Sequence, residues 1–385
     1  MKEKRKIYLD YQASTPTDER VVNEMQEFYL KEFGNPHSTN HIYGWNASKA
    51  IDLSKETISE YLGMREDEVI FTSGATESNN LAIIGTCLKN KEKKRNKILI
   101  SSIEHPCIIE SAQFVQRYLN YKVEIITVNN EGYIDLDVLK NLANDEVLLT
   151  SIMLVNNEIG VIQNIKKIKE ILKPFNILLH SDAAQAPLAT EILNHSQNID
   201  MLSLSGHKFY GPKGIGVLAI KNEAKKSISP IIHGGGQQDN LRSGTLPTPL
   251  CAGFGKGIEI IKKEGEKERK RTSELRNYLY HNLKEVVPNI ILNGPNINDR
   301  HPVNLNLCIP GIIADDLIGS LQPEISISSG SACTTGEIIP SHVLKAIGLS
   351  DEKAECSFRI ATGRYTTKED IDEFVEMLIK KIKEV

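Results

Sequence analysis

Short runs of consecutive apolar residues alternate with longer segments of helical character between residues 66 and 220. Seven of these runs, rich in Val, Ile and Leu, predict buried strands at residues 68–72, 97–101, 122–127, 147–154, 177–180, 200–204 and 216–220. Strands that are apolar throughout and separated by helices are typical of a mostly parallel sheet covered on both faces. We therefore expect an α/β fold in which ligands bind beyond the carboxyl ends of the strands.

The pattern changes after about residue 258. A long charged helix is predicted from Ile258 to Val287, followed by short strands at 303–308 and 325–328 and by a last helix from Lys368. We interpret this part, residues 259–385, as a smaller α+β domain that residues 1–16 complete, beside a large domain formed by residues 17–258.

Composition and charge argue against several classes of protein. The 385 residues include 46 Lys and Arg against 50 Asp and Glu, which gives no electrostatic reason to expect nucleic acid as a partner. No apolar run approaches the ~18 residues that span a bilayer, and residues 1–10 lack a signal-peptide core. We therefore expect no membrane association and a cytoplasmic location. The six cysteines are scattered, so neither a disulfide framework nor a metal site is predicted.

Three groups of polar residues follow predicted strands. Residues 72–80 form a Gly-Ser-Thr turn that opens a helix, where Ala75 and Thr76 could hold a phosphate; a simple helix N-cap is the alternative. Asp182 and Lys208 follow neighbouring strands and are expected ~5 Å apart, either as a salt bridge or as partners of one ligand. A phosphate site, a carboxylate and an amine match the phosphate, ring nitrogen and aldehyde of pyridoxal phosphate, and we favour this joint interpretation.

Other candidate residues fit the same cofactor. His105 could lie over the cofactor ring or be a buried structural histidine, and Asn157 could donate to the phenolic oxygen. Residues 242–245 could bring a further phosphate donor from a neighbouring subunit. Arg359 is either a bidentate clamp for a substrate carboxylate or part of a buried ion pair. Cys333 lies among Gly, Ser and Thr residues, which favours a reactive thiol over a structural core cysteine.

These motifs resemble those of the group I cysteine desulfurases, of the nitrogenase-associated and housekeeping iron-sulfur type, within the fold type I pyridoxal phosphate enzymes. The most specific match combines Ser-Gly-His-Lys at residues 205–208 with Ser-Gly-Ser-Ala-Cys at residues 329–333. Further matches cover the chain almost end to end, at residues 8–16, 34–38, 72–80, 104–106, 156–160 and 242–245 and at Arg359.

The resemblance implies conversion of L-cysteine to L-alanine, with the sulfur carried as a persulfide on Cys333 to an acceptor protein in iron-sulfur cluster assembly, tRNA thiolation or other thiolation. It implies that Lys208 binds the cofactor aldehyde, that Asp182 holds the ring nitrogen protonated and that His105 stacks on the ring. The remaining implied roles are contacts with the phenolic oxygen by Asn157 and Gln185, with the phosphate by Ala75, Thr76, Ser205, His207 and, across a homodimer, Thr245, and with the substrate by Arg359, Asn35 and Asn157.

Two departures and several alternatives accompany the resemblance. Gln12 stands where the family more often has Ala, and the sequence given ends at Val385, without the longer tail with which housekeeping members engage a scaffold protein. The acceptor is therefore left open among iron-sulfur, tRNA, nitrogenase and DNA sulfur pathways. The alternatives are a selenocysteine lyase or small amino-acid aminotransferase of the same fold, and a silent paralogue that acts as a sulfur carrier or binding partner.

Overall fold

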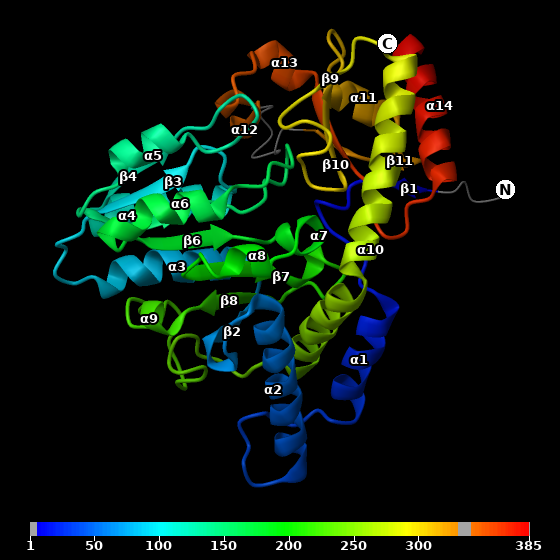
Figure 1. Cartoon of the computed structure of the whole chain (residues 1–385). Helices are drawn as coiled ribbons and strands as arrows, with labels where there is room; N and C mark the ends of the chain where they lie inside the picture. The colour runs from blue at the N-terminus through cyan, green and yellow to red at the C-terminus, as the bar shows by residue number, and fades with distance from the viewer. Residues whose placement is uncertain (1–5, 330–339, 385) are drawn as a thin grey trace.

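A seven-stranded sheet in the order β2-β8-β7-β6-β5-β3-β4 forms the centre of the molecule (Figure 1). The computed structural model describes residues 6–329 and 340–384. The strands pair in parallel except that β8 runs antiparallel to both β2 and β7. Their bounds are β2 (Val69–Thr72), β3 (Lys97–Ser101), β4 (Lys122–Ile126), β5 (Val147–Ser151), β6 (Leu178–Asp182), β7 (Met201–Ser205) and β8 (Gly216–Ile220).

The predicted α/β fold is confirmed, and each of the seven predicted strands is present. Two strand ends differ from the prediction by more than one residue. The strand predicted at 147–154 ends at Ser151, and the strand predicted at 177–180 continues to Asp182. Residues 152–155 are nevertheless fully buried, which explains why their apolar run could not be separated from the strand before it.

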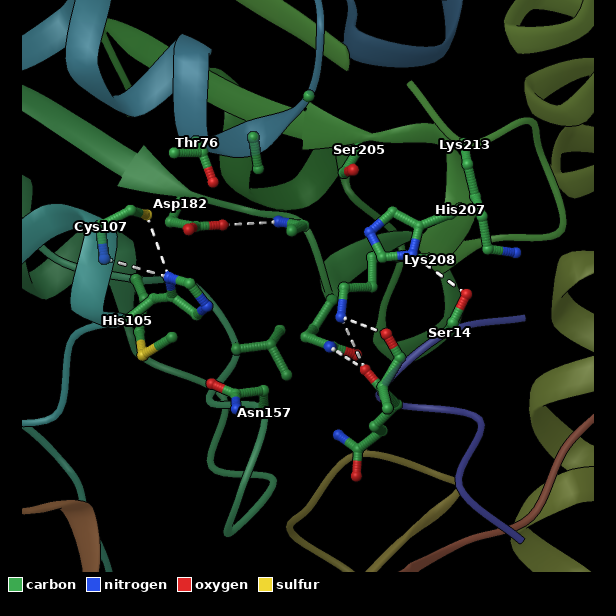
Figure 2. Close-up of a pocket in the computed structure, with 18 of the residues that line it drawn as sticks. Ser14, Thr76, His105, Cys107, Asn157, Asp182, Ser205, His207, Lys208 and Lys213 are labelled. Atoms are coloured by element: carbon green, nitrogen blue, oxygen red, sulfur yellow. Dashed lines mark hydrogen bonds between the residues drawn. The ribbon is translucent and has the colours of Figure 1, made fainter. Parts of the chain in front are cut away.

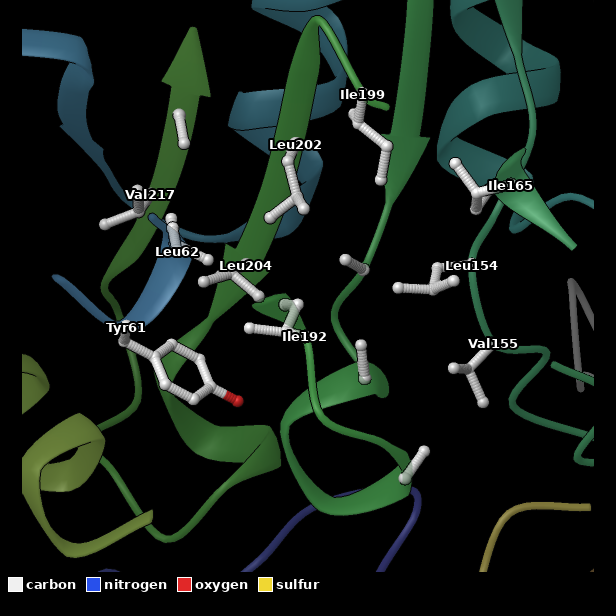
Figure 3. Close-up of a cluster of buried hydrophobic side chains, with 14 of the residues drawn as sticks. Tyr61, Leu62, Leu154, Val155, Ile165, Ile192, Ile199, Leu202, Leu204 and Val217 are labelled. Carbon is white, nitrogen blue, oxygen red and sulfur yellow. The ribbon is translucent and has the colours of Figure 1, made fainter. Parts of the chain in front are cut away.

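Consecutive strand residues fill two cores, one on each face of the sheet. Leu202 and Leu204 of β7 point into one core, shown in Figure 3, whereas Met201 belongs to the other. Helices α3 (Ala75–Lys89) and α4 (Pro106–Leu119) cover the face of Met201. The face of Leu202 is covered by α2 (Ile42–Leu62), α5 (Leu136–Leu142), α6 (Ile165–Leu172), α7 (Ala186–Ala189) and the first part of α10 (Thr248–Val286). The short helix α8 (Leu193–Ser196) lies between β6 and β7, and α9 (Asn222–Lys225) lies between β8 and α10.

Helix α10 begins at Thr248, so its predicted start at Ile258 is wrong. Gly253, Gly255 and Gly257 interrupt the helical pattern because glycine has a low helix propensity. Their lack of a side chain is needed for packing: a Cβ at Gly253 would lie 2.6 Å from the Met25 sulfur, and one at Gly255 would lie 2.8 Å from the Ser54 Cβ. The glycines therefore let α10 approach α1 (Glu19–Leu30) and α2 closely.

The remainder of the chain builds a second, smaller sheet of four antiparallel strands in the order β12-β13-β10-β9. The N-terminal strand β1 (Ile7–Tyr8) pairs with β11 (Ile325–Ser326), and Asp10 forms a bridge to Ala361 of β13. The other elements are β9 (Ile291–Leu292), β10 (Asn304–Cys308), β12 (Ser328–Ser329), β13 (Ser357–Ala361), α11 (Ala314–Ser320), α12 (His342–Ala346), α13 (Asp351–Glu355) and α14 (Lys368–Glu384).

The predicted domain limits at residues 16 and 258 stay a prediction, and α10 runs through the second of them without a break. Within residues 6–329 and 340–384, no helix combines the length and the apolar character that crossing a membrane requires.

Candidate active site

A cavity of about 630 Å³ opens beyond the carboxyl ends of the strands of the large sheet. Its walls come from the N-terminal segment, the turn before α3, the ends of β6 and β7, and Arg359 of β13 (Figure 2). The sequence-predicted site residues that line it are Ala75, Thr76, His105, Asn157, Asp182, Gln185, Ser205, His207, Lys208 and Arg359.

Three predicted site residues are not part of this wall. Thr245 and Asn35 do not line the cavity formed by the described residues of one chain. Cys333 lies outside the described residues, so its position relative to the cavity stays a prediction.

One end of the cavity is formed by the start of α3. Gly74 precedes the helix with φ 155° and ψ 178°, a conformation that is essentially restricted to glycine. A Cβ at Gly74 would have only the Ser205 hydroxyl within 4 Å, at 4.0 Å, so it would project into open space. The first amides of α3 have no acceptor within the helix, and the helix dipole favours negative charge at this end. This end of the cavity therefore suits an anionic group such as a phosphate.

Lys208 lies at the middle of the cavity in the short 3-10 helix Gly206–Lys208 that follows β7. Its Nζ donates hydrogen bonds to the carbonyl oxygens of Gln12 and Ala13, both at 2.8 Å. Burial and then the Arg359 charge lower the pKa of Lys208 to about 8, although Asp182 and Asp10 act in the opposite direction. A lysine with this pKa holds far more neutral amine near neutral pH than an ordinary lysine, as a nucleophilic amine requires.

Asp182 is the last residue of β6 and is 5% exposed. Strand β6 pairs with β7, the strand that Lys208 follows. Its carboxylate accepts hydrogen bonds from the Ala184 amide at 2.9 Å and from the Asn79 side chain at 2.7 Å. The Asn79 Nδ2 also lies 3.2 Å from the Cys107 sulfur. These contacts fix the orientation of a buried carboxylate at the cavity wall.

His105 caps the N-terminus of α4 and points into the cavity (Figure 2). Its Nδ1 accepts a hydrogen bond from the Cys107 amide at 3.2 Å and lies 3.0 Å from the Cys107 sulfur. Burial lowers the pKa of His105, so the imidazole is neutral at neutral pH. Because Nδ1 accepts the amide proton, the ring proton is assigned to Nε2.

The residues predicted to contact the phenolic oxygen and the substrate carboxylate hold the N-terminal segment and one another. Gln185 donates its Nε2 to the Gln12 carbonyl at 2.9 Å. Arg359 donates Nη1 to the Asn157 carbonyl at 3.0 Å and Nη2 to Asp10 Oδ1 at 2.7 Å. The ion pair that the sequence left as one alternative for Arg359 is therefore present, and the same guanidinium lines the cavity.

The structure adds cavity residues that the motif analysis did not identify as site residues. Ser14 and Lys213 line the cavity near His207 (Figure 2), and Ser14 Oγ lies 3.2 Å from His207 Nδ1. Burial lowers the pKa of His207 to about 4, so this imidazole is neutral. Asp10, the partner of Arg359, belongs to the motif at residues 8–16, which the sequence related to the family but not to the site. The pairing of β1 with β11 and the bridge between Asp10 and Ala361 bring that segment to the cavity.

The protein is therefore an α/β protein with a large, mostly parallel sheet. At one edge of the sheet, a cavity brings together a lysine, a carboxylate and a helix start that suits an anion. The sequence profile of the aminotransferase class-V family matches residues 7–374. The chain is 42% identical over 376 residues to the cysteine desulfurase IscS of Rickettsia typhi. The aligned region covers 98% of this chain and 91% of the relative. It is 41% identical over 384 residues to a mitosomal cysteine desulfurase of Trachipleistophora hominis, which covers 99% of this chain and 87% of the relative.

Solved structures agree with these relatives. A NifS-like protein superposes with a TM-score of 0.91 at 31% identity, covering 99% of this chain and all (100%) of the other. SspA in complex with cysteine superposes with a TM-score of 0.81 at 34% identity, covering 94% of this chain and 100% of the other. The chain belongs to the aminotransferase class-V family. Within it, the chain is a cysteine desulfurase that depends on pyridoxal phosphate.

The cavity fits this cofactor on its own chemistry. The open space at Gly74 and the free amides of α3 suit the phosphate. The buried carboxylate of Asp182 suits a protonated ring nitrogen, and the Lys208 amine suits the aldehyde. When bound, pyridoxal phosphate supplies an electron sink for the carbon skeleton of the substrate.

Proposed function

We propose that this cavity is the desulfurase active site and that its residues act in the roles that the resemblance implies. The observation that carries the proposal is the convergence of Lys208, Asp182 and the start of α3 on one cavity, from three separate strand ends. Lys208 would bind the cofactor aldehyde, Asp182 would face the ring nitrogen, and Ala75, Thr76, Ser205 and His207 would hold the phosphate.

Substrate orientation falls to Arg359 in this proposal. Its guanidinium lines the cavity on the side of the small sheet, and Asn157 contributes both the carbonyl that holds Nη1 and a side chain at the cavity wall. A bidentate contact with the carboxylate of L-cysteine would fix the amino group toward Lys208.

Proton movement falls to Lys208 and His105. Lys208 can accept and return a proton near neutral pH because its pKa is lowered to about 8. His105 presents a neutral ring whose Nδ1 is held by the Cys107 amide, so that Nε2 is the atom free to exchange a proton. Burial raises the pKa of the Cys107 thiol to about 12, which makes it a poor candidate for the sulfur-accepting thiolate.

We assign the role of sulfur acceptor to Cys333 because it lies among Gly, Ser and Thr residues in the sequence. Its thiolate would attack the substrate sulfur, forming a sulfur-sulfur bond while the bond between that sulfur and Cβ breaks. The electron pair of the broken bond would stay with the carbon skeleton, which would take up a proton at Cβ and leave as L-alanine. The persulfide would then pass its outer sulfur to a thiol of an acceptor protein. The pathway of that acceptor stays open among those named above.

Mass spectrometry tests the proposal directly. After incubation with L-cysteine, the peptide that contains Cys333 should gain one sulfur atom while alanine appears in solution. Cys333→Ala should lose alanine formation from cysteine but keep the cofactor absorption band, whereas Cys107→Ala should retain both. A Cys333→Ala enzyme that turns over cysteine normally would refute the assignment. Selenocysteine is assayed separately, because a lyase acting on it need not use Cys333.

We further propose that the protein forms a homodimer. Thr245 and Asn35 lie outside the cavity of one chain, and large apolar side chains are exposed at the corner between α1 and α2, namely Tyr29, Leu30, Phe33, Ile42, Tyr43 and Trp45. If Thr245 reaches the phosphate across the dimer, mixing the inactive variants Lys208→Ala and Thr245→Val should restore activity by forming one intact site. No restoration in a mixed dimer that mass photometry demonstrates would exclude this arrangement.

We also propose a cytoplasmic location, in which cysteines stay reduced. The described cysteines are free thiols, namely Cys87, Cys107, Cys251, Cys308 and Cys356. Protease protection of a tagged chain in fractionated cells tests this location.

A further inference from the structure

Arg359, which lines the substrate end of the cavity, is paired with an aspartate that the sequence motifs did not assign to the site. Asp10 follows β1 and lies against Arg359 of β13, with Asp10 Oδ1 accepting from Arg359 Nη2 at 2.7 Å. Its other oxygen, Oδ2, accepts from the Ser328 hydroxyl at 2.7 Å. Asp10 is therefore held from two strands of the small sheet and is a fixed neighbour of the guanidinium.

One nitrogen of the Arg359 guanidinium is buried without a hydrogen-bond partner among the described residues. Nη1 is bound to the Asn157 carbonyl and Nη2 to Asp10, whereas Nε is buried and has no hydrogen-bond partner among the described residues. A guanidinium pairs side-on with a carboxylate through Nε and Nη2, which are the two donors on one edge. Asp10 therefore already binds Nη2, one of the two nitrogens through which a second carboxylate would pair side-on.

We infer that Asp10 is a positioning residue that competes with the substrate carboxylate for Arg359 and thereby sets how weakly the cavity holds carboxylate ligands, including the product L-alanine. This inference rests on the proposed role of Arg359 as the carboxylate clamp. An unopposed, nearly buried guanidinium would bind a carboxylate tightly, because desolvated unlike charges attract strongly. A neighbouring aspartate offsets that attraction and places a like charge beside the incoming carboxylate.

The test compares two amines that differ only in the carboxylate. Both L-alanine and ethylamine react with the cofactor aldehyde, so the absorption band of the holoenzyme reports their dissociation constants without turnover. Asp10→Asn keeps an acceptor for Nη2 but removes the charge. It should bind L-alanine about tenfold more tightly than the wild type, with ethylamine changed by less than about twofold.

Two variants separate this inference from the proposed function. Arg359→Gln should lower the affinity for L-alanine to about the affinity for ethylamine. An unchanged affinity for L-alanine would refute the proposed carboxylate clamp rather than the role of Asp10. Ser328→Ala removes the hydroxyl on Asp10 Oδ2 while keeping the charge, so its L-alanine affinity should stay within about twofold of the wild type.

An Asp10→Asn enzyme that binds L-alanine as the wild type does, or more weakly, would overturn the inference if Arg359→Gln behaves as expected. If Asp10→Asn does not bind the cofactor, Asp10→Ala serves as a second neutral variant. Loss of cofactor binding in both neutral variants, with retention in Asp10→Glu, would show a structural role and would also overturn it.

Discussion

Replacement of Asn79 by Ala should weaken cofactor binding without removing any group that contacts the cofactor in the proposed arrangement. Asn79 is fully buried in α3, and its Nδ2 gives Asp182 one of its two hydrogen bonds, at 2.7 Å; the Ala184 amide gives the other. A hydrogen bond to a charged acceptor contributes about 1.5–3 kcal/mol. Because about 1.4 kcal/mol corresponds to tenfold in affinity, the cofactor dissociation constant should rise by about tenfold to a hundredfold.

The measurement is equilibrium dialysis of pyridoxal phosphate against the apoenzyme, with the neighbouring Asn80→Ala as a matched control. The Asn80 side chain donates only to the Thr76 carbonyl of its own helix, so that variant should bind the cofactor within about twofold of the wild type. Asn79→Asp, which places a second carboxylate against Asp182, should bind more weakly than Asn79→Ala. Wild-type affinity in Asn79→Ala would show that Asp182 keeps its position without Asn79 and would refute the reasoning.

Three further predictions concern buried groups. Burial raises the pKa of Glu104 to about 8 from 4.5, so the folded chain holds a proton that the unfolded chain releases between these values. The free energy of unfolding should therefore fall as pH rises through this window, and Glu104→Gln should flatten that slope in urea titrations; an unchanged slope contradicts the argument. Arg364 forms ion pairs with Asp18 and Glu268, both at 2.6 Å. Arg364→Ala should therefore lower the free energy of unfolding by about 3 kcal/mol in the same assay, and a decrease below about 1 kcal/mol would contradict this prediction. Native alkylation at pH 8 should modify Cys107 at least about tenfold more slowly than Cys333, because burial raises the Cys107 pKa to about 12; equal rates would contradict this.

The strands of the large sheet could be predicted because their apolar runs are set by burial on both faces. The pattern at 147–154 shows the limit of this signal: residues 152–155 are buried like a strand but lie in the loop that lines the cavity with Met153 and Val155. The start of α10 was missed for the opposite reason. Its glycines lower helix propensity, while the tertiary contacts with Met25 and Ser54 that require them cannot be deduced from local sequence.

At the site, residues that follow strands of the large sheet were predictable because parallel topology brings strand ends to one edge. Lys208 and Asp182 are of this kind. Asp10 is not, since it lies 349 positions before Arg359 in the sequence and reaches it through the pairing of β1 with β11 and the bridge to Ala361. The sequence also left open whether Arg359 is a clamp or an ion pair. The structure shows the ion pair with Asp10 and places the guanidinium at the cavity wall, where the clamp stays a prediction.

The polar groups of the cavity are distributed unequally, and this bears on how it could hold a dianionic phosphate. Charged side chains gather toward the substrate end and the middle, where Asp10, Arg359, Asp182 and Lys208 influence one another. Toward the start of α3, Glu77 is paired with Arg242 at 2.8 Å, His207 is neutral because burial lowers its pKa to about 4, and the hydroxyls there are uncharged. Lys213 is the cation on that side of His207, and it is exposed at the mouth. In the proposed arrangement, the phosphate charge would therefore be balanced mainly by oriented amides, by Lys213 and, in the proposed homodimer, by the second chain. Groups outside the buried cavity should then tune cofactor affinity, while the buried charges tune the handling of substrate.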